Sequence, residues 1–154
     1  MAETSMSDIA LKRAMALCAG REMCRSEISH KLSSWGVSEN DAGIIISKLV
    51  KEKFIDEERY SSAFVRDKFR YNKWGKVKIS AALKMKNIPG EIISLALGSI
   101  DDETYLSALR DIISHQRRKV KAKNQYDLNG KLLRFGLSKG FESHLLYDLL
   151  NETE

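Results

Sequence analysis

A threefold repeat of apolar residues constrains the possible folds of this sequence more than any other feature. Val37, Ile88 and Phe141 lie 51 and 53 residues apart, and aligning the chain on them brings further apolar residues into register. These lie nine residues before the reference and five, eight and nine residues after it: Ile28, Ile79 and Leu132; Ala42, Ile93 and Leu146; Ile45, Ala96 and Leu149; Ile46, Leu97 and Leu150. Offsets of five, eight and nine share one face of an α-helix. The sequence therefore predicts one helical unit repeated three times.

Each unit also begins with an apolar stripe of its own. Leu11, Tyr60 and Tyr105 are each followed by apolar residues three and four positions later: Ala14 and Met15, Ala63 and Phe64, Ala108 and Leu109. This spacing is typical of a helix that packs one face against a core. We therefore expect these residues, Phe64 among them, to be buried, and each unit to contain three helices.

Turn and capping residues set the helix boundaries. Gly36, Asn87 and Gly140 follow the second helix of each unit, where glycine and asparagine tolerate a positive φ. Residues with side-chain oxygens precede three helices and favour their first turns: Ser38, Asp56 and Asp101. The predicted helices span roughly 8–20, 26–35, 39–52, 57–72, 76–86, 89–99, 102–121, 125–138 and 142–151.

The predicted fold class is all-α. The chain has a single proline and abundant Ala, Leu, Lys and Glu. It therefore lacks the frequent turn-forming residues that an all-β protein needs. No Gly/Ser-rich linker separates the units. We predict three tandem three-helix repeats, at residues 8–55, 56–100 and 101–152, in an elongated or arc-shaped body.

The cysteines and the hydropathy pattern point to the cytoplasm. Cys18 and Cys24 are six residues apart, without metal-ligand spacing, and a chain of 154 residues can fold without disulfides. No leader peptide is evident, and the longest apolar run, at 14–19, is far shorter than the roughly 20 residues that cross a bilayer. We expect a cytoplasmic protein that does not span a membrane.

The sequence lacks the constellations of an enzyme. His30, His115 and His144 have no partner at the spacing of a metal site or a catalytic triad. The glycines stand mostly alone at helix ends and form no phosphate-binding loop. Paired acids lie at helix starts, where the helix dipole accounts for them. We predict no catalytic residue, no metal site and no cofactor.

Positive charge is concentrated in two segments of the chain. Residues 66–86 and 110–139 together hold seventeen Lys or Arg and three Asp or Glu, whereas the rest of the chain holds nine and eighteen. Such segregation creates a local positive field that attracts polyanions. A basic run can also be merely the solvated face of a helix. The pattern by itself predicts a nucleic-acid or nucleoprotein partner without naming it.

Several longer sequence motifs identify a protein family more specifically than the charge pattern does. The first unit carries Arg25-Ser26-Glu27-Ile28, Lys31-Leu32 and Gly36-Val37. The second carries Phe54-Ile55-Asp56-Glu57-Glu58-Arg59-Tyr60, Ala63-Phe64-Val65-Arg66, and then Gly75, Ile79 and Leu83. The third offers Lys131-Leu132 and Lys139-Gly140-Phe141. Over about residues 8–151 these motifs resemble the RecX family of bacterial recombinase regulators, although Asn87 and Lys76 stand where that family has glycine and often proline.

The resemblance implies a non-enzymatic regulator, of inhibitory type, of the RecA recombinase. Such a protein binds the RecA filament on single-stranded DNA, lies in its helical groove, and limits filament growth, ATP hydrolysis and strand exchange. We expect a monomer. Combined with the charge pattern, the resemblance gives the candidate residues for binding nucleic acid or filament: Arg66, Arg70, Lys73, Trp74, Lys76, Lys78, Arg117, Arg118, Lys119, Lys121, Lys123 and Arg134.

Three alternatives stay open. Trp74 could stack on a base, but packing between two helices is the simpler interpretation. Residues 27–49 could form a helix-turn-helix centred on Gly36, as in a sequence-specific repressor, although the second helix offers few side chains that read bases. A scaffold that binds only protein would also need no active site.

Overall fold

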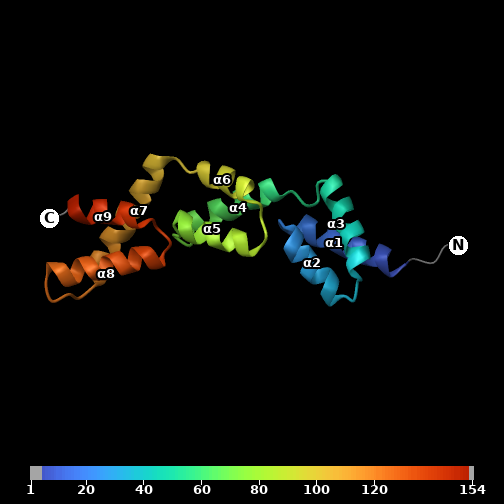
Figure 1. The fold of residues 1–154 in the computed structure, drawn as a ribbon, viewed down its shortest axis with the longest axis horizontal. Helices are drawn as coiled ribbons and strands as arrows, with labels where there is room; N and C mark the ends of the chain where they lie inside the picture. Colours follow the sequence, from blue (N-terminus) through green and yellow to red (C-terminus); the bar gives the residue numbers. More distant parts are fainter. Residues whose placement is uncertain (1–4, 153–154) are drawn as a thin grey trace.

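The computed structural model describes residues 5–152, and over this range the chain forms nine α-helices and no strand (Figure 1). The helices are α1 (Met6–Gly20), α2 (Arg25–Ser34), α3 (Glu39–Lys51), α4 (Glu57–Arg70), α5 (Lys76–Met85), α6 (Gly90–Gly98), α7 (Asp102–Lys119), α8 (Gln125–Ser138) and α9 (Ser143–Glu152). The all-α prediction is confirmed.

The helices form three units in a row, which gives an elongated molecule with its two ends far apart (Figure 1). The first unit contains α1–α3, the second α4–α6 and the third α7–α9, and each encloses its own apolar core. Ile28, Ile79 and Leu132, equivalent in the sequence repeat, are all fully buried. The predicted arrangement of three tandem three-helix repeats is therefore confirmed.

The same turn ends the second helix of each unit. Gly36, Asn87 and Gly140 have φ of 81°, 61° and 93°. The amide of the next residue donates back to a carbonyl five residues earlier: Val37 to Leu32, Ile88 to Leu83 and Phe141 to Gly136. This backbone pattern is a Schellman motif, which turns the chain and satisfies carbonyls at the helix end. The turn also directs Val37, Ile88 and Phe141, the residues on which the repeat is aligned, toward the three cores.

Side-chain caps begin several helices as the sequence indicates. The Ser38 hydroxyl accepts from the amide of Asp41 at 3.2 Å. The carboxylates of Asp56 and Asp101 accept from the amides of Arg59 and Thr104 at 3.0 and 3.1 Å. Each bond satisfies an amide that has no partner within the helix. The Ser38, Asp56 and Asp101 caps thus define where α3, α4 and α7 begin.

The predicted stripe in α4 is right for Tyr60, but Ala63 and Phe64 are less buried than predicted. Tyr60, Ser61 and Val65 are buried, whereas Phe64 is only half-buried. The Phe64 ring stacks with Tyr60 at a centroid distance of 6.0 Å, and the Lys68 ammonium lies over it at 5.5 Å. α4 packs against α6, a tertiary contact that the periodicity of α4 does not specify.

Charged side chains join the first and second units. Glu27 of α2 accepts from the ammonium of Lys86 at 3.0 Å and from the hydroxyl of Tyr60 at 3.3 Å. Burial by itself would raise the pKa of Glu27, but the bonds from Lys86 and from the Cys24 amide outweigh it and lower this pKa. Glu22 and Arg59 form a second ion pair across the same joint.

Backbone groups join the second and third units. The amide of Gly75 donates to the carbonyl of Lys139 at 2.7 Å, and the amide of Val77 donates to the carbonyl of Gly140 at 2.9 Å. Both amides lie at the start of α5, where a helix leaves amides without internal partners. The third unit therefore caps a helix of the second, which fixes the two units against each other.

Tyr105 completes this second joint. Its hydroxyl accepts from the amide of Lys76 at 2.9 Å and donates to the carboxylate of Glu142. Its ring lies between Phe69 and Phe141, at centroid distances of 5.8 and 5.3 Å. Burial, and then the bond to Glu142, raise the pKa of Tyr105 well above its usual value, so the hydroxyl stays protonated. The joint thus combines backbone bonds with an aromatic contact.

Candidate nucleic-acid and filament interface

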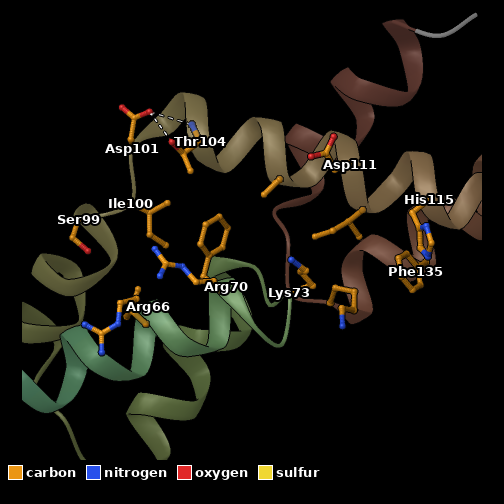
Figure 2. Close-up of a pocket in the computed structure, with 15 residues that line it drawn as sticks. Arg66, Arg70, Lys73, Ser99, Ile100, Asp101, Thr104, Asp111, His115 and Phe135 are labelled. Atoms are coloured by element: carbon orange, nitrogen blue, oxygen red, sulfur yellow. Dashed lines mark hydrogen bonds between the residues drawn. The ribbon is translucent and has the colours of Figure 1, made fainter.

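A groove runs between the second and third units and collects several of the candidate residues. We call it the interunit groove; its walls come from α4 and α7, its volume is about 650 Å³, and Figure 2 shows the side chains that line it. Arg66, Arg70 and Lys73 stand exposed along its α4 side. Lys139, at the end of α8, lines the groove as well and donates to the carbonyl of Asn72 at 3.0 Å. Sequence analysis missed Lys139 as a site residue because its proximity to α4 depends on the joint.

Trp74 lies beside this groove but packs rather than standing free. It is half-buried against the core of the second unit. The ammonium groups of Lys68 and Lys78 lie over its ring, at 4.9 and 4.6 Å from the centroid. A base would have to compete with these cation–π contacts to stack on the indole. The structure therefore favours the packing interpretation of Trp74.

Lys76 and Lys78 belong largely to the second joint. The Lys76 ammonium lies 4.7 Å from the centroid of the Tyr105 ring, and Lys78 is held near Trp74. Lys76 is half-buried. The charges of both lysines add to the positive potential of this region, but neither ammonium extends freely into solvent as the side chains of Arg70 and Lys73 do.

A second basic surface lies at the end of α7. We call residues 117–123 the distal loop, since they lie at the edge of the third unit that faces away from the second (Figure 1). Four of its cations are exposed: Arg118, Lys119, Lys121 and Lys123. Arg117 is half-buried and less available to a partner. The structure thus divides the predicted basic residues between the interunit groove and the far edge of the third unit.

Local bonds hold the distal loop in a defined conformation. Asp127 accepts from the amide of Lys123 at 3.0 Å and pairs with the ammonium of Lys131 at 3.3 Å. These two contacts lower the pKa of Asp127. Lys131 also donates to the carbonyl of Lys121 at 2.6 Å. The loop backbone is therefore tied to α8, while its long basic side chains remain in solvent.

One aromatic residue beside the distal loop escaped the sequence analysis. Tyr126, in the first turn of α8, is 90% exposed. Next to four exposed cations, an exposed ring offers a surface on which a base can stack. Arg134 is exposed two turns further along α8. The missed signal was the tyrosine directly after the Lys-rich stretch, a pattern of basic residues with an interleaved aromatic.

The exposed face of α3 is poorly equipped to read DNA bases. Glu39, Asp41 and Gly43 are exposed there, and Ile44 is 68% exposed. Recognition helices present Arg, Lys, Asn or Gln to the major groove. On α3 such exposed side chains are Asn40 at the start and Lys48 and Lys51 in the last turn, and none lies between Asp41 and Ser47. The geometry around Gly36 therefore gives no support to the repressor alternative.

Other chemistries find no support in the described part of the chain. Across residues 5–152, no three His, Cys, Asp or Glu side chains are arranged to hold a metal ion. None of the helices in that range is long and apolar enough to cross a membrane.

Curated RecX proteins match most of this chain. Regulatory protein RecX of Clostridium botulinum strain Eklund 17B is 31% identical over 130 residues, which cover 82% of this chain and 59% of that protein. RecX of Clostridium acetobutylicum is 29% identical over 148 residues, covering 93% of this chain and 68% of that protein. The family model for the second three-helix domain of RecX matches residues 56–97. Over most of its length the chain is therefore similar to RecX proteins.

Solved RecX structures have the same fold. The crystal structure of a regulatory protein RecX superposes with a TM-score of 0.86 at 21% identity, over 95% of this chain and 71% of that one. RecX from Lactobacillus salivarius gives 0.82 at 21% identity, over 95% of both chains. This chain spans about 59% of the length of the curated relative from C. botulinum. The residues matched by the RecX family model, 56–97, form α4–α6 and so include the α4 wall of the interunit groove.

Proposed function

We propose that this protein regulates the RecA recombinase by binding the RecA filament on single-stranded DNA, as the RecX family resemblance implies. It acts in the cytoplasm as a monomer without a cofactor, and it catalyses no reaction. Its binding limits filament growth, and with it ATP hydrolysis and strand exchange.

One observation supports this proposal beyond the family resemblance: the elongated body carries two separate basic surfaces, one on the second unit beside the interunit groove and one at the far edge of the third unit. Arg66, Arg70 and Lys73 border the interunit groove, while Lys119 and Lys121 belong to the distal loop. A filament is a long, repeating polyanion with protein along it, so a ligand with separated basic surfaces can contact it at more than one place. Simultaneous contacts raise the overall affinity beyond that of either surface.

The binding surface that we propose includes all the predicted residues, with different weights. Arg118, Lys119, Lys121 and Lys123 are exposed and suited to phosphates, because each contact releases a condensed counterion. Arg117 and Arg134 extend this surface, whereas Lys76 packs on Tyr105 at the second joint and Lys78 packs on Trp74 within the second unit. None of these residues is assigned to reading a base sequence.

The direct test is to add the purified protein to its host's RecA on single-stranded DNA and to follow ATP hydrolysis. We expect hydrolysis to fall as the protein is added, and to fall much less with Lys119→Glu/Lys121→Glu/Lys123→Glu. A matched variant, Lys12→Glu/Lys48→Glu/Lys51→Glu, reverses three lysines of the first unit and should behave like the wild type. Unchanged hydrolysis, together with no binding of the filament, would refute the proposed function.

A further inference from the structure

The interunit groove differs in chemistry from the distal loop. Apolar side chains form much of its lining: Val65, Phe69, Ile100, Ala108, Ile112 and Phe135. Phe69 and Ile100 also pack against the cores of both units, so the floor of the groove is continuous with the interior. The size is within the range of ligand-binding clefts. A surface that binds only phosphates does not need an apolar floor.

Opposite charges border the two sides of this floor. On the α4 side, Arg66 and Arg70 lie one helical turn apart and Lys73 follows just after the end of the helix (Figure 2). Arg66 makes only an exposed contact with its neighbour Asp67 at 3.5 Å. Among the described residues, Arg70 and Lys73 have no carboxylate within 4.0 Å. On the α7 side, the lining includes Asp111 and Asp101, whose carboxylate is bonded to Thr104, and Lys139 lines the groove at the end of α8.

This arrangement fits a helix better than a nucleic-acid strand. A single strand carries a phosphate at every nucleotide and would bring some of them against Asp101 and Asp111, where like charges repel. An amphipathic helix can instead place apolar residues on the floor and different charges along its two edges. Carboxylates one turn apart on such a helix match the spacing of Arg66 and Arg70.

We propose that the interunit groove binds an amphipathic α-helix of a protein partner, with its apolar face on Phe69, Ala108 and Ile112 and an acidic edge along Arg66, Arg70 and Lys73. This inference rests on the proposed function, because it assigns the α4 part of the same basic surface to protein and leaves the distal loop for DNA. The backbone bonds from Gly75 and Val77 to the third unit keep the two walls in place, so the groove exists before the partner arrives.

The test uses two kinds of fluorescent probe and three variants of the full chain. One probe is a synthetic helical peptide with leucines on one face and glutamates along one edge, and a matched peptide carries lysines in place of the glutamates. The other probe is a short poly(dT) strand. The variants are Arg66→Glu/Arg70→Glu on the α4 wall, Ala108→Trp on the groove floor and Lys119→Glu/Lys121→Glu/Lys123→Glu in the distal loop. Fluorescence anisotropy measures each affinity at fixed salt.

We expect the glutamate peptide to bind the wild type and the distal-loop variant alike, and to bind the other two variants about tenfold more weakly. The lysine peptide should prefer Arg66→Glu/Arg70→Glu over the wild type, since the charges are then exchanged on both sides. Poly(dT) should show the reverse order, with the greatest loss in the distal-loop variant. The exposed α4 pair can be reversed without disturbing the core, so it tests the groove even if Ala108→Trp fails to fold.

Three outcomes would overturn the inference. The glutamate peptide could fail to bind the wild type, or the α4 variant could lose as much poly(dT) affinity as the distal-loop variant, which would make the groove a nucleic-acid site. A dimer that dissociates in Ala108→Trp would make a second copy of the chain the occupant. Peptide binding by a wild type that binds neither poly(dT) nor the filament would refute the proposed function alone.

Discussion

Gly75 and Gly140 approach so closely that neither position has room for a side chain. A Cβ on Gly75 would overlap the carbonyl group of Gly140, and a Cβ on Gly140 would overlap Lys78. This close approach brings the start of α5 against the turn after α8, where the amides of Gly75 and Val77 find their acceptors. Two glycines from different units therefore allow the second joint to be made of backbone.

Replacing Gly75 by alanine should destabilise this joint. The methyl group meets backbone atoms, which cannot rotate away, so the two hydrogen bonds must lengthen or break. We expect a loss of about 2–4 kcal/mol in the free energy of unfolding, measured by urea denaturation. Gly43→Ala is the control, because nothing lies within 4 Å of a Cβ at that position in α3, and it should stabilise by about 0.5–1 kcal/mol. Equal stabilities of the two variants would contradict the close approach of the two glycines.

A buried hydroxyl in α4 offers a stabilising substitution. Ser61 is fully buried, and its Oγ has no hydrogen-bond partner among residues 5–152. Ser61→Ala removes an unsatisfied polar group and improves helix propensity, so we expect a gain of about 0.5–1 kcal/mol. Thermal unfolding followed by circular dichroism would measure it. A loss of stability would mean that the hydroxyl is satisfied in solution and that α4 packs differently on α6.

Glu27 should make the first joint sensitive to acid. Its pKa is lowered in the folded chain by Lys86 and the Cys24 amide, so the stabilisation is complete above the unfolded pKa of about 4.3 and is lost as the pH falls through the folded pKa. At neutral pH we expect Glu27→Gln to cost on the order of 1 kcal/mol, and at about pH 3 to cost little. Urea midpoints at both pH values measure the difference. Glu52→Gln, which alters an exposed glutamate, should show no such dependence; if it does, the effect belongs to net charge.

Sequence reasoning succeeded where local chemistry decides the structure. The turns at Gly36, Asn87 and Gly140 were predictable because few residues tolerate a positive φ, and the repeat aligned them. The burial of Phe64 was predicted wrongly because it depends on the packing of α4 against α6. Helix periodicity alone contains no information about that packing.

The candidate site was predictable in its residues but not in its grouping. A count of charges found Arg66, Arg70 and Lys73, and it also found the distal loop. Nothing in the sequence places Lys139 beside Asn72, or an apolar floor between α4 and α7, because both depend on how the second and third units are joined. The joint itself depends on two glycines 65 residues apart in sequence (Gly75 and Gly140), which look like ordinary helix ends.

The distal loop should account for most of the salt dependence of DNA binding. Arg118, Lys119 and Lys121 are exposed, and the loop backbone is held by Lys131 and Asp127, so their reversal should leave the fold intact. For Arg118→Glu/Lys119→Glu/Lys121→Glu we expect weaker binding to all sequences alike. The log–log slope of affinity against salt should fall by about one unit for each phosphate that the variant no longer neutralises.

The measurement is a salt titration of binding to two unrelated single strands by wild type and variant, with folding checked by circular dichroism. Reversal of charge should act equally on both strands, because phosphate contacts carry no sequence information. A slope that does not change would remove the distal loop from the DNA surface. A strong preference of the wild type for one strand would instead require base-edge contacts and would favour the repressor alternative.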